Sequence, residues 1–296
     1  MPKKIGFIGL GIMGKPMAKN LLKGGCALSV YDIKKENTAE VCSLGAELSE
    51  ISRIGAECDL IFTILPNGSI VKDVLFGENG LSVFMKKGTI VVDMSSVTPN
   101  ESRECAEGLS RFGVEFLDAP VSGGEPKAVD GTLAFMVGGK EEVFELVTPY
   151  FDIMGSSAIL VGDFGSGSVT KLANQIIVNL TIAAVSEAFV LASKNGADPE
   201  KVYAAIRGGL AGSTVLDAKA KKIINRDFTP GGKISINLKD IKNVMSTAHS
   251  TDVPLPLTGM LLEIMQSLKV SGSLEEDHSA IVKFYENLAG IEVKNN

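Results

Sequence analysis

The chain has 296 residues, of which 45% are hydrophobic and 22% charged, a composition typical of an ordinary soluble protein of one to three domains. Its formal net charge is -6 and no basic block occurs, so we expect no nucleic-acid partner. The four cysteines form no Cys-x-x-Cys pair, and the apolar run at the start is too short for a secretory signal, which predicts a cytoplasmic protein with free thiols. The two histidines, His249 and His278, lie away from any acidic cluster, so we expect no metal site.

Short β-branched runs alternate with helical patterns through the first half of the chain. This alternation predicts a parallel sheet with helices on both faces. The candidate strands are Ile5–Ile8, Leu28–Tyr31, Leu60–Ile64, Ile90–Asp93, Glu115–Asp118, Ala134–Val137 and Ile159–Val161. Helical periodicity is found between them at Met17–Lys23, Val71–Leu75 and Glu101–Phe112.

A glycine loop, Gly9-Leu10-Gly11-Ile12-Met13-Gly14, follows the first candidate strand directly and opens a helix. In this context Gly9 allows a tight turn, Gly11 lets the backbone approach a pyrophosphate, and Gly14 lets helix and strand pack closely. The helix N-terminus offers its amides and dipole to the phosphates. The sequence therefore predicts a dinucleotide site rather than a simple turn.

Asp32 ends the second candidate strand, where a carboxylate accepts hydrogen bonds from ribose hydroxyls. It would also repel a 2′-phosphate, which favours NAD over NADP. Lys34 and Lys35 follow it, and they either lie in a solvated loop or partly neutralise that repulsion. NADP thus stays possible.

Polar and turn-forming residues follow the third and fourth candidate strands. Ligands of such sheets bind outside the carboxyl ends of the strands. Pro66, Asn67, Ser95 and Ser96 fall at these ends, either as cofactor contacts or as ordinary turn residues.

The segment "DAPVSGGEPKAVDGTL" follows the fifth candidate strand. Ser122, Gly123 and Gly124 combine a hydroxyl with unhindered backbone amides, which suits a small carboxylate. A plain glycine turn is the alternative interpretation.

After "VGDFGSGS" the pattern becomes wholly helical. We therefore predict an α/β, doubly wound Rossmann-type domain (1–164) and an all-helical domain (165–296), joined by a long helix. Helices are expected near 167–194, 199–208, 213–225, 237–250, 256–269 and 276–289. The long helix is apolar apart from one stripe, which faces a cavity or else faces solvent or pairs with acids of a neighbouring domain. The stripe consists of Lys171, Asn174, Gln175, Asn179, Thr181 and Ser186.

Four motifs in order, "GFIGLGIMGKPMAKNL", "DAPVSGG", "GSGSVTKLANQ" and "NLKDIKNV", make the chain resemble the β-hydroxyacid dehydrogenases, such as 3-hydroxyisobutyrate and 6-phosphogluconate dehydrogenase, over essentially its whole length. The resemblance implies that Lys171 is catalytic and that Ser122, Gly123 and Gly124 bind the substrate carboxylate. It also implies that the polar stripe faces a cleft between the domains. The cofactor pocket would be lined by Leu65, Pro66, Asn67 and Ser96, with Lys239 near the nicotinamide.

The chain departs from many relatives after the lysine, where Asn174-Gln175 replaces Asn-Asn. A glutamine one turn from Lys171 still presents an amide, with a different reach. Asn174 and Gln175 are therefore joint candidates for contacting the substrate.

Within the family, "DAPVSGGEPKAVDGTL", "AIRGGLAGSTVLDAKA" and "DHSAIVKFYENLA" resemble the tartronate semialdehyde reductase subgroup. This resemblance implies NADH-dependent reduction of tartronate semialdehyde to D-glycerate, with Lys171 as general acid, in a homodimer or homotetramer. The alternatives are a 3-hydroxyisobutyrate or 2-(hydroxymethyl)glutarate dehydrogenase and, in a different class, a non-catalytic dinucleotide-binding sensor or scaffold.

Overall fold

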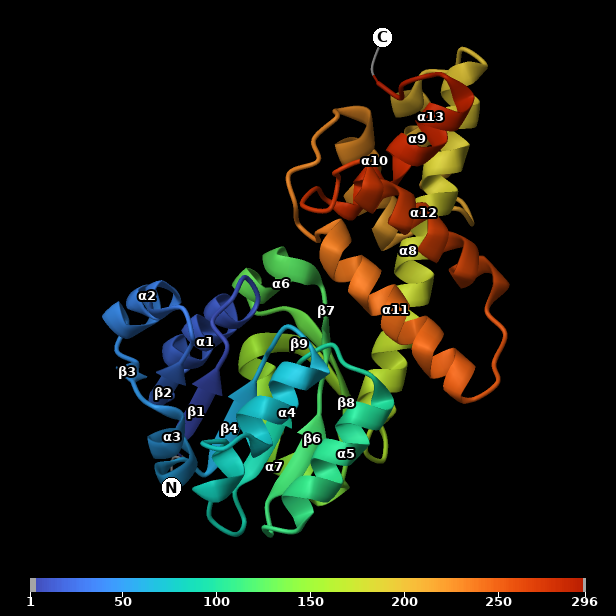
Figure 1. Cartoon of the computed structure of the whole chain (residues 1–296). Coiled ribbons are helices and arrows are strands. Elements are labelled where there is room, and N and C mark those ends of the chain that lie inside the picture. The colour runs from blue at the N-terminus through green and yellow to red at the C-terminus, as the bar shows by residue number, and fades with distance from the viewer. Residues whose placement is uncertain (1–3, 295–296) are drawn as a thin grey trace. The chain divides into compact units, whose positions relative to one another are not determined.

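A computed structural model describes residues 4–294 and divides the chain into two compact units (Figure 1). The first unit ends at Lys171 and the second begins at Leu172. This division falls within the first turns of α8 (Ser166–Lys194), whereas the boundary expected from the sequence precedes that helix.

The first unit is built on a nine-stranded sheet in the order β3-β2-β1-β4-β5-β6-β8-β7, with β9 paired to β8. Strands β1 to β6 are parallel. The strands are β1 (Ile5–Ile8), β2 (Leu28–Tyr31), β3 (Glu47–Leu48), β4 (Leu60–Thr63), β5 (Ile90–Asp93), β6 (Glu115–Asp118), β7 (Val121–Ser122), β8 (Leu133–Gly139) and β9 (Gly155–Gly162). All seven predicted strands are confirmed, and the two-residue strands β3 and β7 were not predicted.

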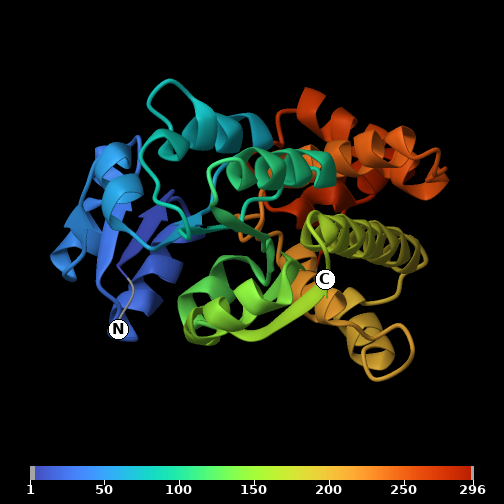
Figure 2. The ribbon, with the colours of Figure 1, turned by 90° about the horizontal axis from the view of Figure 1, so that it is seen from below.

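Helices cover both faces of this sheet, as Figure 2 shows for the first unit. Side chains alternate between the faces, as in any strand. Phe7 and Phe62 pack under α1, α6 and α7, whereas Ile8 and Ile61 pack under α3, α4 and α5. The helices are α1 (Gly14–Lys23), α2 (Ala39–Ser43), α3 (Ile51–Glu57), α4 (Gly68–Phe76), α5 (Pro99–Ser110), α6 (Gly124–Asp130) and α7 (Glu141–Met154), with 3₁₀ turns at Lys35–Asn37 and Leu81–Val83.

The predicted parallel sheet is confirmed from β1 to β6, and β8 departs from it by running antiparallel to β6 and β7. A parallel return needs a long crossover, and α6 has only seven residues, about 10 Å of helix. The chain instead folds back along the strand that it has just left. β7 pairs with β8 in the same register as β6, so Val121 and Ser122 extend β6 beyond the carboxyl edge of the sheet.

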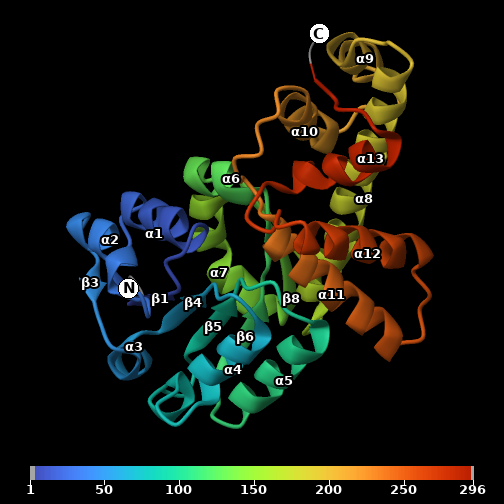
Figure 3. The same cartoon turned by 45° about the horizontal axis from the view of Figure 1, so that its top comes forward.

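The second unit is helical, and its neighbouring helices α11 and α12 lie side by side (Figure 3). Besides most of α8 it contains α9 (Pro199–Ile206), α10 (Thr214–Ile224), α11 (Ile234–Ser250), α12 (Pro256–Val270), a 3₁₀ turn at His278–Ile281 and α13 (Val282–Ala289). The predicted last helix, 276–289, is thus split into a 3₁₀ turn and α13. Asp277 caps this turn by accepting a hydrogen bond from the Ser279 amide.

The polar stripe of α8 is satisfied largely inside the second unit. Asn179 and Ser186 are fully buried, and their side chains donate to the carbonyls of Gln175 and Ile182. Among the described helices α8 alone is long and apolar enough to cross a membrane, a property that long core helices of soluble proteins share. Its polar residues Gln175, Asn179 and Ser186 are buried, whereas Ile177 is 66% exposed.

Asp277 is the buried anchor of the second unit. Its carboxylate, 0% exposed, accepts from Lys219 Nζ at 2.9 Å and from the amides of Gly231 and Gly232. Burial alone would raise the pKa of Asp277, but the Lys219 ammonium, His278 and the Ser279 amide hold that pKa well below its usual range. One carboxylate thus connects α10, the 231–232 loop and the 3₁₀ turn.

We expect Asp277→Asn to lower the free energy of unfolding by about 3–5 kcal/mol, because it leaves the Lys219 ammonium, only 13% exposed, without a counter-charge. Urea unfolding at pH 7 measures the loss. Glu275→Gln is the control, because its pair with Lys233 is exposed and is worth at most about 1 kcal/mol.

The pH dependence of this difference follows from the lowered pKa. The stabilisation by Asp277 is complete above its unfolded pKa of about 3.9 and is lost as the pH falls toward the folded value. The difference in the free energy of unfolding between wild type and Asp277→Asn should therefore become smaller below about pH 4. An equal gap at pH 7 and at pH 3 contradicts the ionic interpretation.

Candidate functional site

The glycine loop lies at the carboxyl edge of the sheet, where β1 pairs with both β2 and β4. This is the switch point at which open α/β sheets bind ligands. A Cβ on Gly9 would lie 2.2 Å from the carbonyl oxygen of Ile64, and one on Gly14 would lie 1.9 Å from that of Gly9. A Cβ on Gly11 would meet nothing within 4 Å. Gly9 and Gly14 are therefore required by packing, whereas Gly11 borders open space that a pyrophosphate can fill.

Asp32 holds the glycine loop in place. Its Oδ2 accepts from the Leu10 amide at 2.6 Å, and its Oδ1 accepts from the amide of Lys34 and from Asn37 Nδ2. Each carboxylate oxygen has lone pairs for more than one donor, so acceptance from a ribose hydroxyl is still open. Asp32 thus shapes the loop in addition to its expected role toward the ribose.

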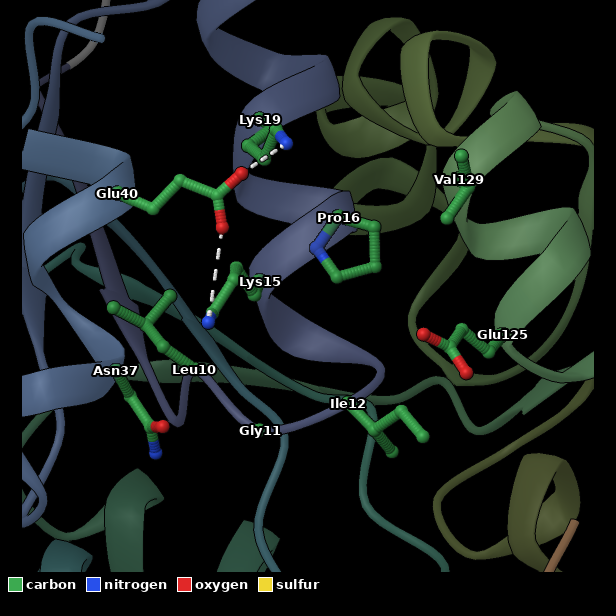
Figure 4. A pocket seen from close by; sticks show the side chains of 10 residues that line it. All are labelled: Leu10, Gly11, Ile12, Lys15, Pro16, Lys19, Asn37, Glu40, Glu125 and Val129. Atoms are coloured by element: carbon green, nitrogen blue, oxygen red, sulfur yellow. Dashed lines mark hydrogen bonds and ion pairs between the residues drawn. The ribbon is translucent and has the colours of Figure 1, made fainter. Parts of the chain in front are cut away.

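A pocket of about 370 Å³ opens beside this loop (Figure 4). Lys15 and Lys19 on α1 both pair with Glu40, at 3.8 and 2.6 Å. Glu125 projects from α6 on the other side of the pocket. The lining residues are Leu10, Gly11, Ile12, Lys15, Pro16, Lys19, Asn37, Glu40, Glu125 and Val129. The pocket therefore reaches from the glycine loop to the helix that follows Ser122–Gly124.

The carboxyl ends of β4 and β5 are connected by a buried relay. Asp93 Oδ1 accepts from Thr63 Oγ1 at 2.7 Å and from Ser95 Oγ at 2.5 Å, and Ser95 Oγ accepts from the Leu65 amide at 2.8 Å. The relay holds the loop after β4 against the loop after β5.

The other residues expected in these two loops differ in exposure. Leu65 and Ser96 are half-buried, and Pro66 and Asn67 are exposed. Asn67 caps α4 by accepting from the Ile70 amide, which gives it a structural role as well.

Ser122 lies at the end of the β6–β7 extension, and the chain turns there. Gly123 and Gly124 have φ angles of 137° and 69°, in the region that favours glycine. A Cβ at Gly123 would come within 2.7 Å of the Lys127 side chain. These glycines are therefore needed for the turn that follows the Ser122 hydroxyl.

Lys171 reaches the same turn from the first turns of α8. Its Nζ donates to the carbonyl oxygen of Val121 at 2.8 Å, immediately before Ser122, and its side chain is half-buried. The first unit thus brings the amine of Lys171 to the Ser122–Gly124 turn.

Asp118, at the end of β6, fixes the start of α8. Its Oδ1 accepts from the Gly165 amide at 2.8 Å and its Oδ2 from the Ser168 amide at 2.7 Å. Burial raises the pKa of Asp118 to about 6, although the amide hydrogen bonds favour the charged form. This role of Asp118 was not predicted, since an acid before Ala-Pro carries no recognisable capping signal in the sequence.

The second unit contains the remaining expected residues. Gln175 is 6% exposed, its Nε2 donates to Asp240 Oδ2 at 2.7 Å and to Asn237 Oδ1, and its Oε1 accepts from Asn174. Asp240 also pairs with Lys239 at 3.1 Å. Gln175 thus holds the acid that pairs with Lys239, while Asn174 is half-buried.

We expect Gly11→Ala and Gly14→Ala to separate ligand approach from packing. Gly14→Ala should destabilise the first unit by more than about 3 kcal/mol, because its Cβ would meet backbone. Gly11→Ala should unfold like the wild type yet bind NADH about tenfold more weakly, a loss of about 1.4 kcal/mol. Urea unfolding and NADH fluorescence titration measure the two effects. Wild-type NADH affinity in Gly11→Ala would remove Gly11 from the binding site.

Known families match both parts of the chain. Residues 4–162 match the family described as the NAD binding domain of 6-phosphogluconate dehydrogenase. Residues 165–285 match the family described as NAD-binding of NADP-dependent 3-hydroxyisobutyrate dehydrogenase. The glycine loop thus lies within an NAD(P)-binding domain.

Similar proteins match over nearly their full length. The chain is 45% identical over 287 residues to 2-hydroxy-3-oxopropionate reductase of Escherichia coli K12, covering 97% of this chain and 98% of the relative. It is 39% identical to 2-(hydroxymethyl)glutarate dehydrogenase of Eubacterium barkeri, covering 98% and 97%.

A solved structure extends the likeness to the fold. The 3-hydroxyisobutyrate dehydrogenase of Mycobacterium tuberculosis, determined with L-serine, superposes with a TM-score of 0.89 at 27% identity, covering 96% of this chain and 99% of that one. The chain belongs to the β-hydroxyacid dehydrogenase family, as a 3-hydroxyisobutyrate dehydrogenase-like, NAD(P)-binding oxidoreductase close to 2-hydroxy-3-oxopropionate (tartronate semialdehyde) reductase.

Proposed function

We propose that this oxidoreductase reduces tartronate semialdehyde to D-glycerate with NADH, and that Lys171 is the general acid. The observation that carries the proposal is the hydrogen bond from Lys171 Nζ to the Val121 carbonyl, one residue before the Ser122–Gly124 turn. The similarity to 2-hydroxy-3-oxopropionate reductase of Escherichia coli supports the choice of substrate.

The glycine loop and the loops after β4 and β5 would hold the dinucleotide. Open space lies beside Gly11, just before α1, and the N-terminal amides and dipole of that helix would suit a pyrophosphate there. Asp32 would accept from the ribose hydroxyls, and its charge opposes a 2′-phosphate. When bound, the reduced nicotinamide supplies the hydride.

The turn at Ser122–Gly124 would bind the carboxylate of the substrate. The Ser122 hydroxyl and the backbone amides of the two glycines are donors without bulky side chains between them. A carboxylate bound there has its neighbouring carbons close to the Lys171 amine, because that amine contacts the peptide before Ser122.

Lys171 would stabilise the charge that develops on the carbonyl oxygen during reduction. Its ammonium donates a proton to that oxygen as the aldehyde becomes an alcohol, and in the reverse direction the neutral amine accepts the proton. The Val121 carbonyl accepts from the Lys171 ammonium and so holds the amine beside the Ser122 turn. The roles of Asn174, Gln175 and Lys239 toward substrate and nicotinamide stay predictions.

We expect Lys171→Ala to lower kcat by at least about 1,000-fold, within the range for general acid catalysis, while NADH binds nearly as in the wild type. Stopped-flow measurement of aldehyde reduction gives kcat, and titration with NADH gives the binding affinity. The matched control is Lys194→Ala on the same helix, since Lys194 also donates to a backbone carbonyl, that of Ala289. Turnover by Lys171→Ala at the rate of the control would end the assignment.

Substrate choice is tested with tartronate semialdehyde, methylmalonate semialdehyde and 2-formylglutarate, each with NADH and NADPH. We expect kcat/KM to be at least about tenfold higher for tartronate semialdehyde with NADH, the discrimination that small differences in substrate size provide. The Lys171→Ala protein serves as the blank.

Two other outcomes of this substrate comparison would favour a different function. Preference for 2-formylglutarate would favour the activity named for the Eubacterium barkeri relative. Failure with every aldehyde would support a dinucleotide-binding sensor or scaffold, a reading that the presence of Lys171 disfavours.

A further inference from the structure

The start of α8 is attached to the carboxyl end of β6 by one buried carboxylate. Asp118, 1% exposed, accepts from two amides of the segment that begins α8, those of Gly165 and Ser168. A carboxylate at a helix N-terminus has charge-assisted hydrogen bonds and a favourable interaction with the helix dipole. α8 is 29 residues long, so this interaction lies at the head of a full helix.

The first turn of α8 lies so close to β6 and β8 that the backbone leaves no room for side chains at Gly138 and Gly167. A Cβ on Gly138, the β8 partner of Asp118, would lie 2.5 Å from Asp118 Oδ1 and 2.8 Å from the Gly167 amide. A Cβ on Gly167 would lie 2.5 Å from the Asp118 carbonyl oxygen and 2.3 Å from that of Met136. The sequence therefore keeps glycine on both sides of the carboxylate, which leaves the first turn of α8 little freedom to shift.

A third contact fixes the same turn from α5. The hydroxyls of Ser102 and Ser168 are hydrogen-bonded at 2.8 Å, and both residues are 1% exposed. The turn that carries Ser168 is thus held at its backbone by Asp118 and at its side chain by Ser102.

These contacts fix the backbone position from which the Lys171 side chain extends. Lys171 follows Ser168 by one helical turn, and Val121, whose carbonyl accepts from Lys171 Nζ, follows Asp118 by the same number of residues. The β6–β7 segment and the first turn of α8 are therefore connected twice, once through Asp118 and once through Lys171. Any movement of the first connection moves the amine relative to the Ser122 turn.

We infer that Asp118 is a positioning residue for Lys171, acting through the first turn of α8, with Ser102, Gly138 and Gly167 completing the joint. This inference rests on the proposed role of Lys171 as general acid. Asp118 acts without contacting the reacting atoms, so its loss should affect the chemical step and spare dinucleotide binding.

The test is Asp118→Asn, which keeps the size of the side chain but replaces one acceptor oxygen by a donor facing an amide. We expect kcat to fall by about 10- to 100-fold, as for a catalytic group displaced by about 1 Å, while the Kd for NADH changes by less than about twofold. Hydrogen exchange should speed up at the amides of residues 165–171.

The matched control is Asp163→Asn, in the same connection between β9 and α8. Asp163 is exposed, and its carboxylate accepts a local hydrogen bond from the amide of the next residue, Phe164. We expect its kcat and exchange rates to match the wild type. A folded Asp118→Asn protein with the kcat of this control overturns the inference, and so does a loss of kcat with an equal loss of NADH affinity.

Ser102→Ala gives a second measurement should Asp118→Asn fail to fold, because it removes one neutral hydrogen bond and no charge. We expect kcat to fall about threefold with NADH affinity unchanged, since the turn is loosened and not released. An unchanged kcat in this variant overturns the inference.

Lys171→Ala, measured alongside, separates the two hypotheses. Retained turnover in that variant ends the general-acid assignment and the positioning role with it. An inactive Lys171→Ala protein together with a fully active Asp118→Asn protein ends the positioning role alone.

Discussion

Backbone amides that leave the edge of a parallel sheet lose their ladder partners, and in this protein aspartates supply the acceptors. Asp32 accepts from the amides of Leu10 and Lys34, Asp93 from that of Ser95, and Asp118 from those of Gly165 and Ser168. Each follows or ends a strand, β2, β5 or β6, at the edge where the glycine loop lies. A buried amide without a partner costs about 1–3 kcal/mol, so these carboxylates determine which loop conformations are accessible.

The same constraint explains how a candidate site can be built from loops and still be well defined. Asp93 reaches the loop after β4 through Ser95, which accepts from the Leu65 amide. Asp118 reaches the start of α8, which carries Lys171. The glycine loop, the loop after β4 and the start of α8 are thus each attached, directly or through Ser95, to an aspartate at the end of a strand. Charged acceptors suit this purpose, because their hydrogen bonds to amides are short and strong.

The sequence predicts what depends on local pattern and fails where distant backbone decides. Strands such as Ile5–Ile8 and Ile90–Asp93 were predicted at their observed bounds, because strands buried on both faces are continuous apolar runs. The glycine loop was recognisable from its strand-and-helix context. The direction of β8 was not, since it depends on the shortness of α6 and on pairing with β6 and β7. Asp118 was missed because its partners, Gly165 and Ser168, lie far along the chain.

The stripe on α8 shows why residue type alone does not identify a functional group. Asn179 and Ser186 donate to carbonyls of their own helix and are fully buried, and Gln175 donates to Asp240. Such groups are satisfied, and exposing them to a ligand would require breaking hydrogen bonds in a region of low dielectric. Lys171 differs, because its half-buried side chain bears a charge and donates to the Val121 carbonyl, next to the Ser122 turn. We therefore expect the chemistry at Lys171, the position of the stripe that combines a positive charge with a half-buried side chain.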